Sequence, residues 1–260
     1  MRIGEIKNKA REGLRGKWMK AIGILLAYWV VFILLEILTY FLSIFTIIGG
    51  IVLNVAALIP LSFGLLVSFI KLLRNEEIKS FEFCDIGLEN FKRSWKIKLR
   101  IYLKTIISII CQLIGSFAII IFITGKIIAG LQTLGNTVLI HPKEVFEMPI
   151  NIFIFGCIML IAGIILCIIQ RLPYVLSYMI VYDNPNLSSK EVIDKSKNLM
   201  IGNKIKYVAL QLSFIGWMIL GIITYGIGFI WIIPYMKASN ICFYEDIIKS
   251  NGDLQETNDE

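Results

Sequence analysis

Long runs of apolar residues alternate with short blocks rich in lysine and arginine along the whole chain. A helix needs about 20 residues to cross a hydrocarbon core of ~30 Å, so apolar runs of that length are typical of membrane spans. These runs predict about six transmembrane helices, at residues 21–45, 51–70, 101–123, within 150–182, and two within 207–244. The expected fold class is therefore all-α, a polytopic transmembrane helical bundle.

The last apolar run is too long for a single crossing of the membrane. Tyr225 and Gly226 lie near its middle, and glycine readily adopts the conformations that tight turns need. We therefore expect these two residues to form the turn between spans five and six.

The basic residues predict which side of the membrane each loop occupies. Of the 26 lysines and arginines, only Lys126 and Lys143 fall in the segment between spans three and four. The others lie before span one, around the loop between spans two and three, around the loop between spans four and five, or near the C-terminus. By the positive-inside rule, both termini and the two basic loops are cytoplasmic, and residues 125–149 are external.

A short amphipathic helix is predicted ahead of span five, within residues 185–202. Ser188 and Glu191 have the spacing of a capping box, and Gly202 stands where a C-terminal cap would. Apolar residues recur between them at near-helical spacing, so we expect this helix to lie on the inner membrane surface. Residues 3–18 and 81–100 show the same mixture of large apolar and basic side chains.

Two of these amphipathic segments share a short motif. KAREGLRGK at residues 9–17 and KSKNLMIGN at residues 195–203 match at several positions, and each precedes a span. The match is short enough to arise by chance. If it is a true repeat, the chain holds three copies of an interfacial helix followed by a two-span hairpin, the third fitting more loosely.

Composition supports a membrane protein and narrows its partners. Of the 260 residues, 57% are hydrophobic and 17% are charged, and the mean hydropathy is +0.76. The net charge of +7 comes from residues that flank apolar runs, which favours anionic lipid headgroups of the inner leaflet as partners over nucleic acid. We expect one integral membrane domain at residues 1–247 and an acidic, disordered cytoplasmic tail at residues 248–260.

Two ionisable residues inside predicted spans are candidates for function. Glu36 lies within span one, where a charged side chain costs about 3 kcal/mol on insertion scales. It either makes a structural contact between helices or handles a proton or a substrate. Arg171 lies deep in the bilayer if span four ends near Tyr182, where it could pair with Glu36. If the span ends near Ile169, Arg171 extends to the inner surface instead, which we favour.

Other polar residues in the spans have simpler interpretations. Gln112 and Gln211 are expected to form hydrogen bonds between helices, although they too are candidate substrate contacts. The candidates for lipid headgroup binding are basic or aromatic residues near the inner interface: Lys9, Arg11, Lys195, Lys197, Tyr174 and Tyr178. Tyr174, Tyr178 and Tyr182 recur every four residues, as in an aromatic belt.

Metal and cofactor sites are not indicated. The five cysteines show no CxxC spacing, His141 is the one histidine, and His141 with Glu144 makes only two of the ligands that a metal needs. HExxH, Walker and GxSxG patterns are absent, so an enzyme is disfavoured. We therefore expect neither a metal nor a cofactor.

Several motifs resemble an uncharacterised family of bacterial membrane proteins, domain of unknown function 975. They are KAREGLRGKW near the N-terminus, YDNPNLSSKEVIDKSKNLMIGNK from Tyr182, and then LSFIGW, PY and FY. The resemblance implies a multi-pass protein of the bacterial cytoplasmic membrane, distantly similar to the membrane domain of some glycerophosphodiester phosphodiesterases. It implies no activity. Where the family usually has Ile-Pro-Gly in span four, this chain has Ile165, Leu166 and Cys167.

These observations favour a non-enzymatic membrane protein that acts as an accessory or lipid-interacting component. The alternative is a small transporter that uses Glu36. Either could act as a homo-oligomer or with another membrane protein.

Overall fold

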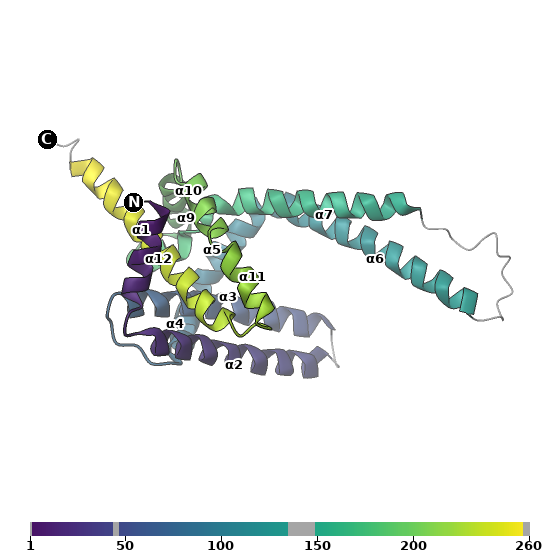
Figure 1. Ribbon diagram of the computed structural model, residues 1–260, viewed down its shortest axis with the longest axis horizontal. Coiled ribbons are helices and arrows are strands. Elements are labelled where there is room, and N and C mark those ends of the chain that lie inside the picture. The colour runs from purple at the N-terminus through teal and green to yellow at the C-terminus, as the bar shows by residue number, and fades with distance from the viewer. Residues whose placement is uncertain (1, 44–46, 135–148, 257–260) are drawn as a thin grey trace. The chain divides into compact units, whose positions relative to one another are not determined.

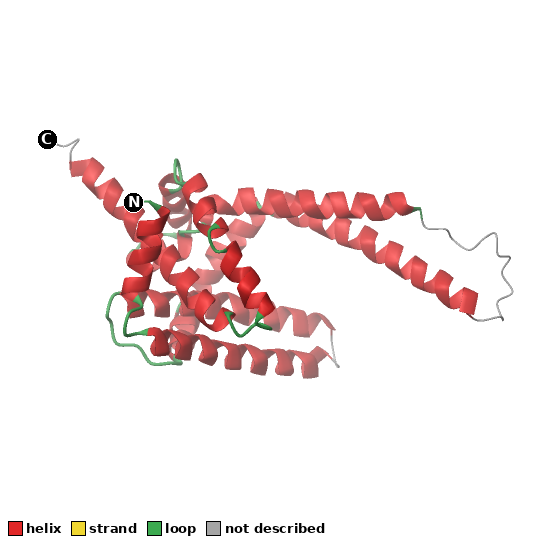
Figure 2. Cartoon of the chain, viewed as in Figure 1, coloured by secondary structure: helices red, strands yellow, loops and turns green. Residues whose placement is uncertain are grey.

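A computed structural model describes residues 2–43, 47–134 and 149–256 of the chain. Every secondary-structure element formed by these residues is a helix (Figure 2). The chain divides into two compact units: one combines the residues up to Leu99 with those from Pro173 onward, and the other contains Arg100–Leu172. Each unit is described separately, and the single membrane domain expected from the sequence stays a prediction.

The N-terminal part of the first unit contains a helical hairpin with short helices beside it. Its helices are α1 (Ile3–Gly13), α2 (Trp18–Ser43), α3 (Ile47–Leu73), α4 (Glu82–Glu89) and the start of α5 (Phe91–Lys104). Figure 1 shows α2 and α3 side by side. Helix α4 packs so closely against α3 that a Cβ atom at Gly64 would collide with the carbonyl oxygen of Phe83.

The C-terminal part of the same unit contains α8 (Ser177–Asp183), α9 (Ser189–Leu199), α10 (Lys204–Leu212), α11 (Ile215–Ile223) and α12 (Phe229–Glu256). Tyr225 and Gly226, with φ angles of 51° and 91°, form the turn between α11 and α12. The predicted fold-back at these residues is confirmed. Helix α12 packs against α1, α2 and α3, so the two ends of the chain meet in one unit.

The second unit is a long helical hairpin. It contains the end of α5, α6 (Ile106–Leu134), α7 (Ile150–Arg171) and the first residue of a 3₁₀ turn at Leu172–Tyr174. Gly115 allows the two helices to approach closely, because a Cβ atom there would lie 2.7 Å from the backbone nitrogen of Leu160. Gln112 donates a hydrogen bond to the carbonyl of Gly163, at 3.1 Å.

Among the described residues, five helical segments are long and apolar enough to cross a membrane, which indicates a multi-pass membrane protein. They are Trp18–Leu42, Ala56–Leu73, Ile106–Ile128, Ile150–Asp183 and Lys204–Ile223. The sequence predicts about six, and the difference lies in α12. That helix contains Lys237 and, further along, Glu245 and Asp246, so its apolar stretch is short.

The predicted amphipathic helix is present as α9. The Glu191 carboxylate accepts a hydrogen bond from the backbone N–H of Ser188 at 2.7 Å, and Gly202 has a φ of +78°. Its apolar face does not lie open to lipid, however, because Val192 and Met200 are fully buried in the protein. Helix α8 packs against α9, and the position of α9 at the inner membrane surface stays a prediction.

Helix α1 repeats the features of α9 at a constant offset. Glu5 accepts a hydrogen bond from the backbone N–H of Arg2, and Gly16 has a φ of +74°. Ala10 and Leu14 are fully buried, as are the matching Ser196 and Met200. This agreement supports the internal repeat. The third predicted copy, at residues 81–100, differs from these two. Its first helix, α4, ends at Asn90, which has a negative φ, whereas α1 and α9 are followed by the left-handed Gly16 and Gly202.

The acidic tail expected to be disordered from residue 248 continues α12 as helix up to Glu256. No proline interrupts this segment, so the helix of α12 extends through it. Residues 257–260 lie outside the described part of the chain.

Candidate functional site

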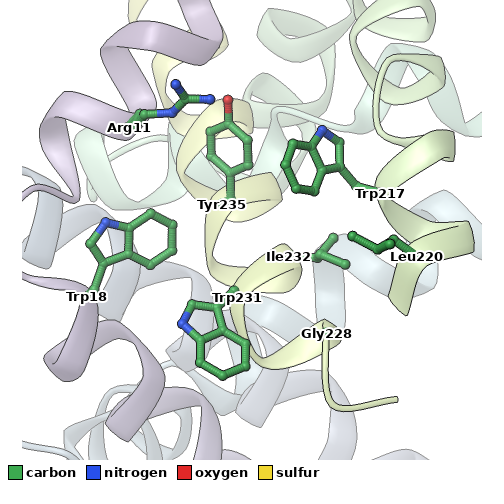
Figure 3. Close-up of a pocket in the computed structure, with 8 residues that line it drawn as sticks. All are labelled: Arg11, Trp18, Trp217, Leu220, Gly228, Trp231, Ile232 and Tyr235. Atoms are coloured by element: carbon green, nitrogen blue, oxygen red, sulfur yellow. The ribbon is translucent and has the colours of Figure 1, made fainter. Parts of the chain in front are cut away.

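Eight residues from α1, α2, α11, α12 and the turn before α12 surround a cavity of about 330 Å³ in the first unit (Figure 3). We call it the aromatic groove; its lining residues are Arg11, Trp18, Trp217, Leu220, Gly228, Trp231, Ile232 and Tyr235. Trp217 and Trp231 are 45% and 51% exposed, whereas Ile232 and Tyr235 are buried. The groove therefore has a buried floor and an open, aromatic rim.

The turn between α11 and α12 positions two of the tryptophans. The Thr224 hydroxyl donates to the carbonyl of Gly221 and accepts from the N–H of Gly228, both at 3.0 Å. A Cβ atom at Gly228 would lie 2.9 Å from the Thr224 Oγ1 atom, so the residue must be small. This tight turn brings α11, with Trp217, beside α12, with Trp231.

Lys7 and Tyr235 fix α1 beside the break between α10 and α11. The Lys7 ammonium donates to the backbone oxygen and the hydroxyl of Ser213, at 3.3 and 3.2 Å. The last carbonyls of α10 lack helical partners, and the ammonium donates to an oxygen at this helix end. Lys7 also lies 4.4 Å above the ring of Phe214, and the Tyr235 hydroxyl donates to the Lys7 carbonyl at 3.3 Å.

The edge of the groove carries positive charge that no carboxylate of the described residues neutralises. The Arg11 guanidinium lies 5.9 Å from the centre of the Tyr235 ring, and the two side chains are neighbours in Figure 3. Burial lowers the pKa of Lys7, and the nearby charge of Arg11 lowers it further. Two cations therefore lie close together next to the apolar walls of the groove.

A second polar cluster lies at the ends of α3 and α8. Arg74 forms a bidentate ion pair with Asp183, at 2.6 and 3.1 Å, and the Tyr244 hydroxyl donates to Asp183 at 2.9 Å. The hydrogen bond with Asp183 raises the pKa of Arg74. Lys9 joins this cluster through Glu245, at 3.2 Å. Its charges are mutually compensated, so its role is to hold α1, α3, α8 and α12 together.

The structure separates most of the predicted headgroup residues. Of these, Arg11 lines the groove, whereas Lys9 is in an ion pair and Lys195 donates to the Asn184 side chain at 3.2 Å. Lys197 is exposed on α9, and Tyr178 packs edge-on against Phe63 with 5.4 Å between ring centres.

The predicted row of tyrosines is interrupted. Tyr174 ends the 3₁₀ turn that follows α7, whereas Tyr178 and Tyr182 belong to α8. Residues 175 and 176 form a turn that separates Tyr174 from α8. The three tyrosines therefore do not share one continuous helical face.

The intramembrane candidates occupy separate places. Glu36 lies on the exposed side of α2. Arg171 is the last residue of α7, with its guanidinium 5.7 Å from the ring of Tyr102. Their pairing would join the two units and stays a prediction. Gln112 bonds to the Gly163 carbonyl, and Gln211 donates to the Asn240 side chain at 2.6 Å. His141 and Glu144 lie outside the described residues.

The sequence analysis missed the tryptophans of the groove, although its motifs contain two of them. Trp18 ends KAREGLRGKW, Trp217 ends LSFIGW, and Tyr235 ends PY. Three segments that are far apart in the sequence therefore meet at one groove.

The chain belongs to the DUF975 family. The family model, which is described as a protein of unknown function, matches residues 1–251. No curated protein and no solved structure matches the chain. The family assignment of this DUF975 protein thus agrees with the resemblance seen in its motifs and brings no activity with it.

Proposed function

We propose that this DUF975 protein is a non-enzymatic membrane component that binds lipid in the aromatic groove. The observation that carries the proposal is an open, apolar cavity with a cation at its edge, built next to a candidate span. The lining side chains include neither a nucleophile nor a general base. Binding, and not chemistry, is therefore the role that this groove supports.

The proposal includes location and orientation. The positive-inside rule favours a bacterial cytoplasmic membrane protein whose two termini are cytoplasmic. Arg11 and Lys7 precede the first candidate span, so the edge of the groove would lie at the inner leaflet. Anionic headgroups are abundant there and attract basic residues.

The transport alternative has less support from the geometry. Glu36 is not among the residues that line the groove, and it lies on the exposed side of α2. A role for Glu36 in transport stays a prediction from the sequence.

Native mass spectrometry of the full chain, released from detergent, tests whether lipid occupies the groove. We expect the wild type to retain bound lipid and the double variant Trp217→Ala/Trp231→Ala to lose most of it. These side chains are about half exposed, so their removal should leave the fold intact. Trp29→Ala is the matched control, because Trp29 is 44% exposed on α2 and does not line the groove. Equal lipid retention by all three proteins would contradict the proposal.

A further inference from the structure

We infer that the aromatic groove binds one acyl chain of an anionic glycerophospholipid, whose phosphate is held by Arg11 at the rim. This inference rests on the proposed function and names the class of lipid.

The walls of the groove fit a single acyl chain. Ligand sites in proteins occupy roughly 300–1,000 Å³, and the groove, at about 330 Å³, lies at the lower end of that range. Trp18, Leu220 and Ile232 offer apolar surface to the interior. An aliphatic chain gains free energy when it replaces water against such surface. The volume suits one chain, while the rest of the lipid stays in the bilayer.

The charges at the rim favour a phosphate. Three other lysines of this unit are paired with carboxylates: Lys9 with Glu245, Lys71 with Glu82, and Lys206 with Asp246. Arg11 and Lys7 form no such pair among the described residues, although Arg11 is close enough to lower the pKa of Lys7. A guanidinium can donate two parallel hydrogen bonds to phosphate oxygens, which makes Arg11 the natural phosphate ligand.

Lys7 acts as a positioning residue for this site. Ser213 accepts from its ammonium through two oxygens, and a lysine has three N–H donors, so one donor stays available. Its contact with Phe214 keeps the charge fixed beside Tyr235 and Arg11. The positive charges of Lys7 and Arg11 are therefore held in place where α1, α10 and α12 meet.

The combined features distinguish a lipid phosphate from related ligands. A free phosphate or glycerol phosphate would contact Arg11 but leave the apolar walls in contact with water. A zwitterionic lipid would bring a second cation next to Arg11 and Lys7, which is unfavourable. An uncharged diacylglycerol would fill the groove and leave both cations uncompensated.

The test uses the full chain in detergent, stripped of bound lipid. Phosphatidylglycerol, phosphatidylcholine, diacylglycerol and water-soluble glycerol 3-phosphate are titrated separately, and binding is followed by native mass spectrometry and by the rise in Tm. We expect phosphatidylglycerol to bind about tenfold or more tightly than either other lipid, because diacylglycerol lacks the phosphate and phosphatidylcholine adds a cation next to Arg11 and Lys7. Glycerol 3-phosphate should give no measurable shift.

Two variants identify the residue responsible. Arg11→Gln should abolish the preference for phosphatidylglycerol, and Arg11→Lys should keep part of it because the charge remains. Arg15→Gln is the matched control, since Arg15 is exposed nearby and does not line the groove. Arg11 is itself exposed, so neither change should prevent folding.

The outcomes separate the inference from the proposed function. Equal affinity for all three lipids, or a preference that survives Arg11→Gln, would overturn the inference and leave lipid binding in place. A response to glycerol 3-phosphate as strong as to phosphatidylglycerol would show that the site recognises phosphate without a chain. Failure of every lipid to bind would overturn the proposed function as well.

Discussion

At the scale of single residues, Lys7 makes contacts with residues that are far from it in the sequence. It lies on α1 yet reaches the break between α10 and α11, where it donates to Ser213 and stacks over Phe214. The sequence analysis used the N-terminal basic residues as an orientation signal and named Lys9 and Arg11 as headgroup candidates. The structure divides them into an ion pair at Lys9, a helix-end contact at Lys7 and an unpaired rim residue at Arg11 among the described residues.

The lowered pKa of Lys7 predicts a specific dependence of stability on pH. Burial and the charge of Arg11 lower this pKa below 10.5 in the folded state, so the unfolded chain binds the proton more tightly. The charged ammonium therefore costs stability at neutral pH, and the cost disappears as pH rises from the lowered pKa to 10.5. We expect the Tm of the lipid-free wild type to rise over this interval relative to that of Lys7→Gln.

Thermal unfolding at a series of pH values measures this difference. Lys7→Arg serves as the control, because a guanidinium keeps its charge throughout the range. A difference between wild type and Lys7→Gln that does not change with pH would contradict the assignment. Bound anionic lipid should reduce the effect, since its phosphate stabilises the charged form of Lys7.

At the scale of helices, the sequence was most informative where one short-range rule decides the outcome. The capping box at Ser188, the left-handed glycine at Gly202 and the turn at Tyr225 were all predicted, and each depends on a few adjacent residues. The break at Ser213 was not predicted, because the apolar pattern continues across it. Contacts from Lys7, which is far away in the sequence, accompany this break.

The buried faces of α1 and α9 show the same limit. Hydrophobic periodicity predicts that a helix has an apolar face, but it does not say whether lipid or protein covers that face. Here protein covers it, with Ile6 and Val192 fully buried. Hydrophobic periodicity likewise could not predict the groove, because its tryptophans come from α2, α11 and α12, which meet only after folding.

The two left-handed glycines that end the repeated helices lead to a prediction at this scale. Gly16 and Gly202 have φ angles of +74° and +78°, and a Cβ atom at either position would meet no neighbour. Alanine there should therefore destabilise through the backbone alone, by about 1–2 kcal/mol, and should lower the Tm. Asparagine, which tolerates this conformation, should cost less.

Gly4 provides the matched control within α1. It is helical, and a Cβ atom at this position would also meet nothing within 4 Å. Gly4→Ala should stabilise by about 0.5–1 kcal/mol, because alanine is the better helix former. If Gly16→Ala and Gly4→Ala shifted the Tm in the same direction, the shared C-terminal cap of the repeat would be wrong.

At the scale of the whole molecule, the ion pair between Lys9 and Glu245 bears on topology. Lys9 precedes the first candidate span, and Glu245 lies in α12, after the fifth. An odd number of crossings would place these residues on opposite sides of a membrane, where a contact of 3.2 Å is impossible. We therefore predict an even number of crossings, with Glu245 on the same side of the membrane as the N-terminus.

Reporter fusions to the full chain and to truncations distinguish the two topologies. Green fluorescent protein folds in the cytoplasm and alkaline phosphatase is active outside it, so each fusion junction can be assigned to a side. We expect a junction after Glu260 to be cytoplasmic, like the N-terminus. An external C-terminus would mean five crossings and would require the contact between α1 and α12 to be absent in the membrane. A cytoplasmic C-terminus would instead place Arg11 and the rim of the aromatic groove at the inner leaflet, where anionic lipids are available to fill it.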